Sequence, residues 1–101
     1  MSGTAGWHGT RVAAARRYWA RRIADAAVRS HPLLCPFCTQ PVLPTHTWDI
    51  DHDVKRIDGG PLGYHNQRPA HTACNRADGA RIAAARKGAR ITRLRPWKGP
   101  R

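Results

Sequence analysis

The sequence predicts one small α+β domain. Three features lead to this fold class: a helical apolar stripe near the start of the chain, two short extended segments in the middle, and an alanine-rich helical segment after them. With 101 residues the chain buries only a thin core. Folds of this size often add a metal or disulfides to hold the core together. The three cysteines are therefore expected to contribute to stability.

Residues 1–9 are rich in glycine and are expected to form a flexible N-terminus. Residues 10–29 predict a helix, which ends before Pro32 because the residue preceding a proline is pushed out of the helical region. Its apolar side chains recur at three- and four-residue spacing and form a narrow stripe toward the core: Val12, Ala15, Trp19, Ile23 and Ala26.

Two strands are predicted next, over residues 47–53 and 67–70, with a glycine-containing loop between them. An alanine-rich helix follows from Thr72 to Lys87. Thr72 is a candidate N-cap for this helix, and Gly88 is expected to end it.

The charge of the chain is strongly positive. Its 18 Lys and Arg residues outnumber 6 acidic residues, which gives a net charge of +12. Such a field favours a polyanion, with nucleic acid as the first candidate and an anionic membrane as the second. The folded domain is expected to span residues 10–88, followed by a basic tail over residues 89–101. We expect both parts to contact phosphates, through Arg16, Arg17, Arg21, Arg76, Arg81, Arg93, Arg95 and Lys98.

A membrane span and an export signal are not expected. No apolar run approaches the length of a membrane span, and arginines interrupt the segment where a signal peptide needs an apolar core. Reduced thiols without an export signal indicate the cytoplasm.

Two pairs of soft ligands have zinc-like spacing. Cys35 and Cys38 form a Cys-x-x-Cys knuckle, and His71 and Cys74 repeat the spacing at the start of the second predicted helix. Structural zinc takes four such ligands in tetrahedral geometry. The pattern predicts one structural Zn²⁺ that closes the long excursion over residues 39–70. A disulfide is the alternative, but it would leave one of three thiols unpaired.

Two other zinc classes fit less well. A DNA-reading zinc finger has about twelve residues between its ligand pairs, far fewer than the excursion over residues 39–70 that separates the two pairs here. A zinc deaminase needs a His-x-Glu motif, and the chain contains no glutamate. The zinc is therefore expected to hold the domain together.

The excursion contains an acid–histidine pair, Asp51 and His52, which makes the chain a candidate nuclease. The order and spacing of its residues, over 35–79, resemble the HNH endonuclease family, and in particular small phage proteins of the zinc-bearing branch. This resemblance implies a ββα-metal (His-Me finger) domain with a structural zinc knuckle, an N-terminal helix and a basic C-terminal tail. Beside the zinc ligands, the positions that carry it are Asp51, His52, Gly59, Gly60, Asn66 and Asn75.

The chemistry of these side chains suits phosphodiester hydrolysis, which needs an activated water and a Lewis acid. A neutral histidine can take a proton from water near pH 7, so His52 is the candidate general base. Asp51 and Asn75 offer hard oxygens to Mg²⁺ or Mn²⁺ and leave open positions for phosphate and water. Many family members have histidine where Asn75 stands. The resemblance gives Asn66 the role of bracing the loop and orienting the base.

This assignment carries a geometric requirement. Adjacent strand residues face opposite sides, so Asp51 and His52 can serve one site only where the strand ends or bulges. Asp49 and Asp53 would share the face of Asp51 on a regular strand. They rank below Asp51 as metal ligands, and nearby arginines are their expected partners.

The sequence thus predicts a divalent-metal-dependent endonuclease for double-stranded DNA. Sequence preference should be low, because no element resembles a base-reading helix. The resemblance implies a phage setting, in which the packaging terminase is a possible partner, and no small-molecule organic cofactor is expected. The alternative is a non-catalytic, zinc-stapled DNA-binding module, which leaves the acid–histidine pair without a role. A third alternative, an RNA-binding zinc protein, would need exposed aromatic clusters for base stacking, and the sequence does not predict them.

Overall fold

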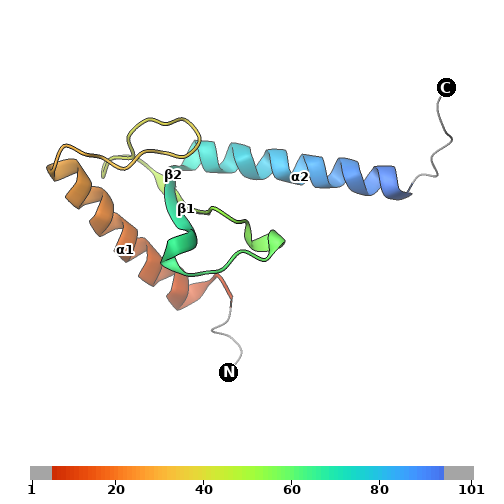
Figure 1. Ribbon diagram of the computed structural model, residues 1–101, viewed down its shortest axis with the longest axis horizontal. Coiled ribbons are helices and arrows are strands. Elements are labelled where there is room, and N and C mark those ends of the chain that lie inside the picture. Colours follow the sequence, from red (N-terminus) through yellow and green to blue (C-terminus); the bar gives the residue numbers. More distant parts are fainter. Residues whose placement is uncertain (1–5, 95–101) are drawn as a thin grey trace.

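The structure, a computed structural model, describes residues 6–94, with side chains as far as residue 89. Helix α1 (Gly9–Val28) comes first, and helix α2 (Thr72–Leu94) comes last. Between them, β1 (Trp48–His52) and β2 (Gln67–His71) form a two-stranded antiparallel sheet, which lies between the helices in Figure 1. The predicted α+β fold class is confirmed. In the described range no helix is long and apolar enough to cross a membrane.

The buried face of α1 is the stripe predicted from the sequence. Ala15, Trp19 and Ile23 are buried, whereas Arg17 and Arg21 are exposed. Trp19 and Ile23 pack into a core cluster with buried residues from the following loop and the sheet, which are Cys35, Val42, Trp48 and Ala70. Because α1 has no side-chain cap at its first turn, this burial is the main contribution that holds the helix in place.

The sheet pairs five residues of each strand in regular register. Asp51 stands opposite Arg68, and His52 stands opposite Gln67. Directly opposite residues of an antiparallel pair share a face of the sheet, and consecutive residues alternate between faces. Asp51 and His52 therefore start from opposite faces, and β1 ends at His52 without a bulge.

The loop between the strands folds back tightly on itself. It contains two short 3₁₀ helices, η2 (Arg56–Asp58) and η3 (Tyr64–Asn66). The N–H of Gly60 donates to the carbonyl of Lys55 at 2.9 Å. A Cβ at Gly60 would lie 1.8 Å from the carbonyl oxygen of Val54, so only glycine allows this close approach.

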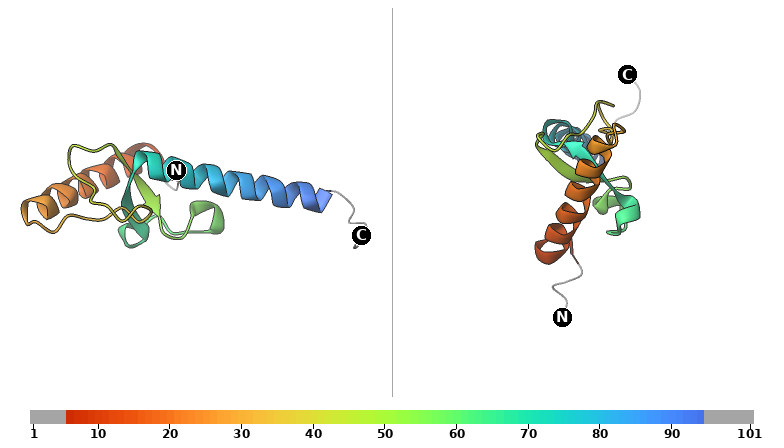
Figure 2. Two further views of the ribbon diagram at one scale, coloured as in Figure 1. Left: turned by 90° about the horizontal axis from the view of Figure 1, so that it is seen from above. Right: turned by 90° about the vertical axis from the view of Figure 1, so that its left-hand side faces the viewer.

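Helix α2 continues the chain directly from β2, and two expectations about its ends are corrected. Thr72 is the first helical residue, and its N–H donates to the carbonyl of Thr47 at 3.1 Å. The predicted stop at Gly88 is wrong, because α2 continues to Leu94 and includes the first residues assigned to the tail. A glycine inside an exposed helix costs only about 1 kcal/mol relative to alanine, and the neighbouring alanines and arginines favour helix. The outer turns of α2 project away from the sheet (Figures 1 and 2).

Candidate active site and metal centre

Four potential metal ligands meet where the loop after α1 approaches the junction of β2 and α2. The sulfurs of Cys35, Cys38 and Cys74 and one ring nitrogen of His71 lie within 4.8 Å of one another. Tetrahedral zinc with bonds of about 2.0–2.3 Å places its ligand atoms roughly 3.5 Å apart. The structure therefore brings the predicted quartet together in a cluster that could hold one zinc ion.

A tight backbone turn forms the knuckle that carries Cys35 and Cys38. The N–H of Cys35 donates to the carbonyl of Gln40, and the N–H of Thr39 donates back to the carbonyl of Cys35, both at 2.9 Å. Thr39 takes a left-handed conformation, with φ of 62°. This turn presents both thiols to the same side.

The imidazole of His71 is oriented by its outer nitrogen. Nδ1 lies 3.2 Å from the sulfur of Cys38, and Nε2 is 2.9 Å from the carbonyl of Pro41, to which it can donate. A hydrogen bond of this kind fixes the tautomer of a metal-binding histidine and leaves the other nitrogen free to bind. His46, which spacing did not select, stands at the edge of the cluster, with Nδ1 3.3 Å from Nε2 of His71.

The thiols of the cluster differ in acidity. Burial acts to raise the pKa of Cys35, but backbone hydrogen bonds, chiefly from Cys38 and His71, outweigh it and lower the pKa to about 6. Burial and the neighbouring sulfurs raise the pKa of Cys74 to about 11. Negative charge therefore gathers on Cys35, and a cation bound beside Cys74 would favour the ionised form of that thiol. Three thiols and an imidazole form a donor set that suits zinc.

Asp51 is a buried carboxylate in a chain of ion pairs whose cations are partly or largely exposed. Its side chain is 4% exposed, Oδ1 accepts from Nζ of Lys55 at 2.5 Å, and Oδ2 accepts from Nε of Arg68 at 2.8 Å. Lys55 also contacts Oδ2 of Asp78 at 2.9 Å, and Asp78 pairs in addition with Arg81. The chain links β1 to α2 through the loop between the strands.

Sequence reasoning missed three members of this chain, which are Lys55, Arg68 and Asp78. Asp78 carried a signal, because it is one of only six acids and stands three residues after Asn75. Residues three apart in a helix lie on the same face. Asn75 therefore lies on the same face of α2 as Asp78, which the Lys55 ammonium links to Asp51. Carboxylate and amide oxygens form a hard donor set that fits Mg²⁺ or Mn²⁺.

His52 is almost completely enclosed at the end of β1. It is 6% exposed, and its Nε2 is buried without a hydrogen-bond partner among the described residues. The ring of Trp7 packs edge-on against it, with 4.6 Å between centroids. Burial, followed by the positive charges of Arg56 and Lys55, lowers the pKa of His52 below 6.5, although the nearby charge of Asp51 opposes the shift. The imidazole is therefore neutral at pH 7.

Asn66 braces the loop that follows His52. Its Oδ1 accepts from the N–H of Val54 at 2.8 Å, and its Nδ2 donates to the carbonyls of Val54 and Pro61, both at 2.9 Å. The backbone carbonyl of Asn66 also accepts from the N–H of Asp53 at 2.9 Å. One buried amide thus joins both arms of the loop.

The lower-ranked acids of β1 and its flank have arginine partners. Asp49 lies 4.0 Å from Nη1 of Arg16, and Asp53 lies 3.2 Å from Nη1 of Arg68. Arg16 also stacks over the ring of Trp48, with 4.3 Å to the centroid, and donates to the Trp48 carbonyl at 3.2 Å. Arg16 therefore helps to hold α1 against β1, in addition to its predicted contact with phosphate.

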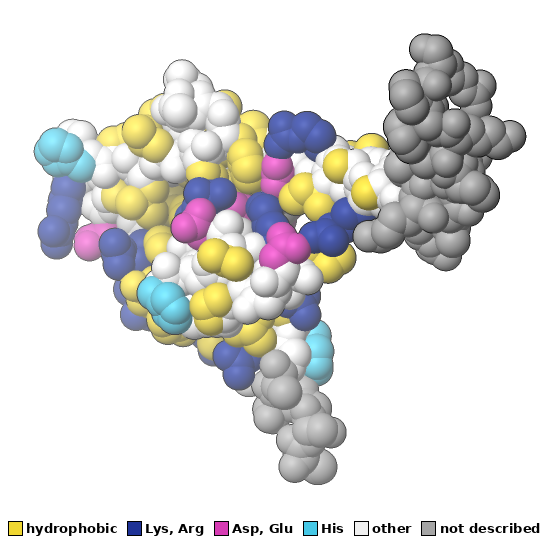
Figure 3. Space-filling model, turned by 45° about the vertical axis from the view of Figure 1, so that its right-hand side comes forward, with side chains coloured by type: hydrophobic (Ala, Val, Ile, Leu, Met, Phe, Trp, Pro, Cys, Tyr) yellow, Lys and Arg dark blue, Asp and Glu magenta, His cyan; other side chains and the backbone are white. Residues whose placement is uncertain are grey.

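The other arginines predicted to contact phosphate differ in their surroundings. Arg17, Arg21, Arg76 and Arg81 are all exposed, and Arg81 is in addition paired with Asp78. Figure 3 shows Lys and Arg side chains spread over the visible face, with a few acidic side chains among them. Three predicted contacts lie outside the described side chains, and these are Arg93, Arg95 and Lys98.

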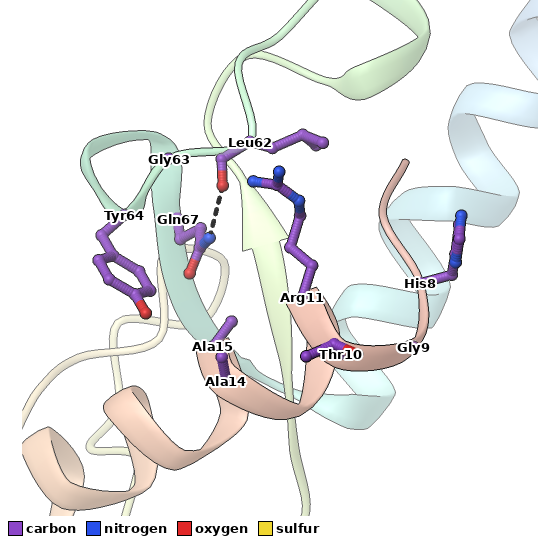
Figure 4. Close-up of a pocket in the computed structure, with 10 residues that line it drawn as sticks. All are labelled: His8, Gly9, Thr10, Arg11, Ala14, Ala15, Leu62, Gly63, Tyr64 and Gln67. Carbon is purple, nitrogen blue, oxygen red and sulfur yellow. Dashed lines mark hydrogen bonds between the residues drawn. The ribbon is translucent and has the colours of Figure 1, made fainter. Parts of the chain in front are cut away.

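A cavity of about 560 Å³ lies between the first turns of α1 and the segment before β2. Its lining includes Arg11, Tyr64 and Gln67, and Figure 4 shows Gln67 joined to the carbonyl of Leu62. Because Gln67 pairs with His52 in the sheet, the cavity adjoins the strand ends that carry the candidate base.

Comparison with known proteins identifies one family. Residues 35–81 match the family model described as HNH endonuclease. No curated protein and no solved structure matches the chain. The matched segment contains the metal cluster, both strands and the first turns of α2, and it leaves out α1. Residues 35–81 are therefore similar to an HNH endonuclease domain, and their cysteines and histidine fit a zinc-binding member of that family.

Proposed function

We propose that the protein is a divalent-metal-dependent endonuclease that hydrolyses phosphodiester bonds in double-stranded DNA. The HNH match supports a nuclease or nucleic-acid-binding role, and the net charge of +12 favours a polyanionic substrate. The catalytic part of the proposal rests on His52. It is a neutral, buried imidazole beside Asp51, and its Nε2 has no hydrogen-bond partner among the described residues.

In this mechanism His52 takes the proton of the attacking water, which a neutral imidazole can do near pH 7. Asp51 and Asn75 would hold Mg²⁺ or Mn²⁺, which supplies Lewis-acid stabilisation of the phosphate when bound. Asn66 keeps the loop folded behind His52, and this restraint limits the positions that the imidazole can take. The pairing of Asp51 with Arg68 brings a further positive charge to the face where phosphate would lie.

Side chains from the two faces of β1 can reach the same phosphate because the strand ends at His52. A DNA strand that passes this end can approach the base from one face and the Asp51 carboxylate from the other. Low sequence preference is part of the proposal because no predicted element resembles a base-reading helix. A phage host cytoplasm and work beside a packaging terminase complete the proposal, and the phage setting rests on the family resemblance.

The test is nicking of supercoiled plasmid by the zinc-loaded protein in Mg²⁺, in Mn²⁺ and in EDTA. His52→Ala should abolish nicking, whereas His65→Ala, which alters an exposed histidine of η3, should not. Zinc content and DNA affinity should stay near native values in both variants.

The rival function is a DNA-binding module that cuts nothing. One observation favours it, since both oxygens of Asp51 already accept hydrogen bonds from Lys55 and Arg68. This rival would be supported if the protein binds DNA without metal and cleaves it under none of these conditions. His52→Ala should then bind DNA as the native protein does.

A further inference from the structure

The ammonium of Lys55 lies between two carboxylates that come from different elements. It is 2.5 Å from Oδ1 of Asp51 on β1 and 2.9 Å from Oδ2 of Asp78 on α2. The two carboxylates are 4% and 10% exposed, and the lysine side chain is 25% exposed. Hydrogen bonds to both acids hold the pKa of Lys55 above its ordinary value despite the opposing effect of burial.

Lys55 is not needed to neutralise either carboxylate. Asp51 keeps an ion pair with Arg68 at 2.8 Å, and Asp78 keeps one with Arg81. A shared ammonium that each partner can lose without becoming an unpaired buried charge is free to move at modest cost. This redundancy separates Lys55 from an ordinary structural salt bridge.

The position of the ammonium is also the position of a divalent cation. Mg²⁺ binds oxygen at about 2.0–2.1 Å, so an ion that binds Oδ1 of Asp51 from the side of α2 would overlap the ammonium, which lies 2.5 Å from the same atom. Asn75 lies one turn before Asp78 on α2, on the same side of the helix. A cation that Asp51 shared with Asn75 would therefore compete with the Lys55 ammonium for this carboxylate oxygen.

We propose that Lys55 competes with the catalytic cation for the carboxylate of Asp51 and that Asp78 holds the ammonium when it is displaced. Without divalent metal, the ammonium satisfies Asp51. When a divalent cation binds Asp51, the ammonium withdraws to Asp78, which keeps it beside the site. Lys55 thus sets the metal affinity of the centre, and Asp78 acts through Lys55 as a positioning residue. This inference rests on the proposed assignment of Asp51 as a ligand of the divalent metal.

The test measures Mn²⁺ binding to the zinc-loaded protein without DNA, from the electron paramagnetic resonance signal of free Mn²⁺. Lys55→Met should tighten Mn²⁺ binding about ten- to a hundredfold, the factor that corresponds to no longer displacing one charge-assisted hydrogen bond. The matched control is Arg86→Met, which removes a cation that pairs with Asp58 and touches neither Asp51 nor Asp78. Its affinity should remain near the native value. Equal tightening in both variants would show a general charge effect and overturn the proposal.

Asp78 supplies the second arm of the test. Asp78→Asn should weaken Mn²⁺ binding, because Lys55 is then left with Asp51 alone. In the Lys55→Met background the same substitution should change nothing. If Asp78→Asn weakens binding equally in both backgrounds, Asp78 is a direct ligand and the proposed role of Lys55 is wrong.

The outcomes separate this inference from the proposed function. Tighter Mn²⁺ binding by Lys55→Met, with no DNA cleavage by any variant, would support the proposed role of Lys55 and contradict the proposed nuclease activity. Mg²⁺-dependent cleavage by the native protein, with no tightening in Lys55→Met or in a second variant, Lys55→Gln, would support the nuclease activity and contradict the role of Lys55. Zinc content and circular dichroism confirm the fold of each variant before titration.

Discussion

The indole Nε1 of Trp19 donates a hydrogen bond of 2.7 Å to Oε1 of Gln67. Trp19 belongs to α1, outside the matched HNH segment, and Gln67 pairs with His52 in the sheet. Nε2 of Gln67 in turn donates to the carbonyl of Leu62 at 2.8 Å. The N-terminal helix is thereby tied to the strand pair at the level of the candidate base.

Trp19→Phe should lower the free energy of unfolding by about 1–3 kcal/mol, because it leaves the buried Oε1 of Gln67 without its donor. Urea unfolding of the zinc-loaded protein measures the loss. Tyr18→Phe is the control, since the Tyr18 hydroxyl only accepts an exposed hydrogen bond from Arg22. A loss no larger than that of Tyr18→Phe would contradict a structural role for this contact.

Each chain should bind one zinc ion, and its removal should unfold the centre of the domain, because structural zinc binding is folding energy. His71→Ala should lose the metal in elemental analysis, whereas His46→Ala, at the edge of the cluster, should keep it. Zinc affinity should rise with pH, since the Cys74 thiol, with a pKa of about 11, must lose its proton to bind. Active, folded protein without stoichiometric zinc would contradict the assignment.

The nicking rate should be constant near pH 7 and fall only below pH 6.5. The folded-state pKa of His52 is lowered by burial and by Arg56, and only the neutral imidazole can accept a proton. Arg56→Ala removes one cause of the shift and should move the acid limb to higher pH. The pH–rate profile of native and variant protein checks both statements. An acid limb above pH 7 in native protein would exclude His52 as the base.

Asn66→Ala should reduce nicking about ten- to a hundredfold, as losses of supporting hydrogen bonds around a catalytic site commonly do. It frees the backbone groups of Val54 and Pro61 that the amide now binds. Zinc content should not change, because no zinc ligand lies in this loop. Full activity in the variant would show that the brace is dispensable.

DNA affinity should fall roughly a thousandfold between 50 and 200 mM salt if about six phosphates are contacted. The double variant Arg17→Ala/Arg21→Ala, which alters two exposed side chains of α1, should flatten the slope of log affinity against log salt by up to about 1.8. Filter binding over a salt series measures it. An affinity insensitive to salt would show that base contacts carry the binding.

The parts of the fold that sequence could predict depend on local spacing. The knuckle of Cys35 and Cys38 and the stripe through Trp19 and Ile23 follow from separations of three or four residues. The continuation of α2 through Gly88 was missed because a single glycine costs little among good helix formers.

The parts of the site that sequence could not predict depend on strand register. Arg68 meets Asp51 only because the two strands pair as they do, and Lys55 reaches Asp78 only once α2 leaves β2 at its observed angle. The contact between Trp7 and His52 joins residues far apart in sequence through packing of α1. Spacing predicts none of these contacts.

The projecting part of α2 has a thermodynamic consequence. The side chains from Ala83 to Ala89 are exposed, and Arg86 forms a half-exposed ion pair with Asp58. These turns therefore gain little from burial and depend largely on the intrinsic helix preference of alanine and arginine. Their backbone amides should exchange with solvent deuterium through local openings, well before the amides of Trp48–His52 do. We therefore expect two levels of stability, with a centre that depends on zinc and a helical arm that opens more readily.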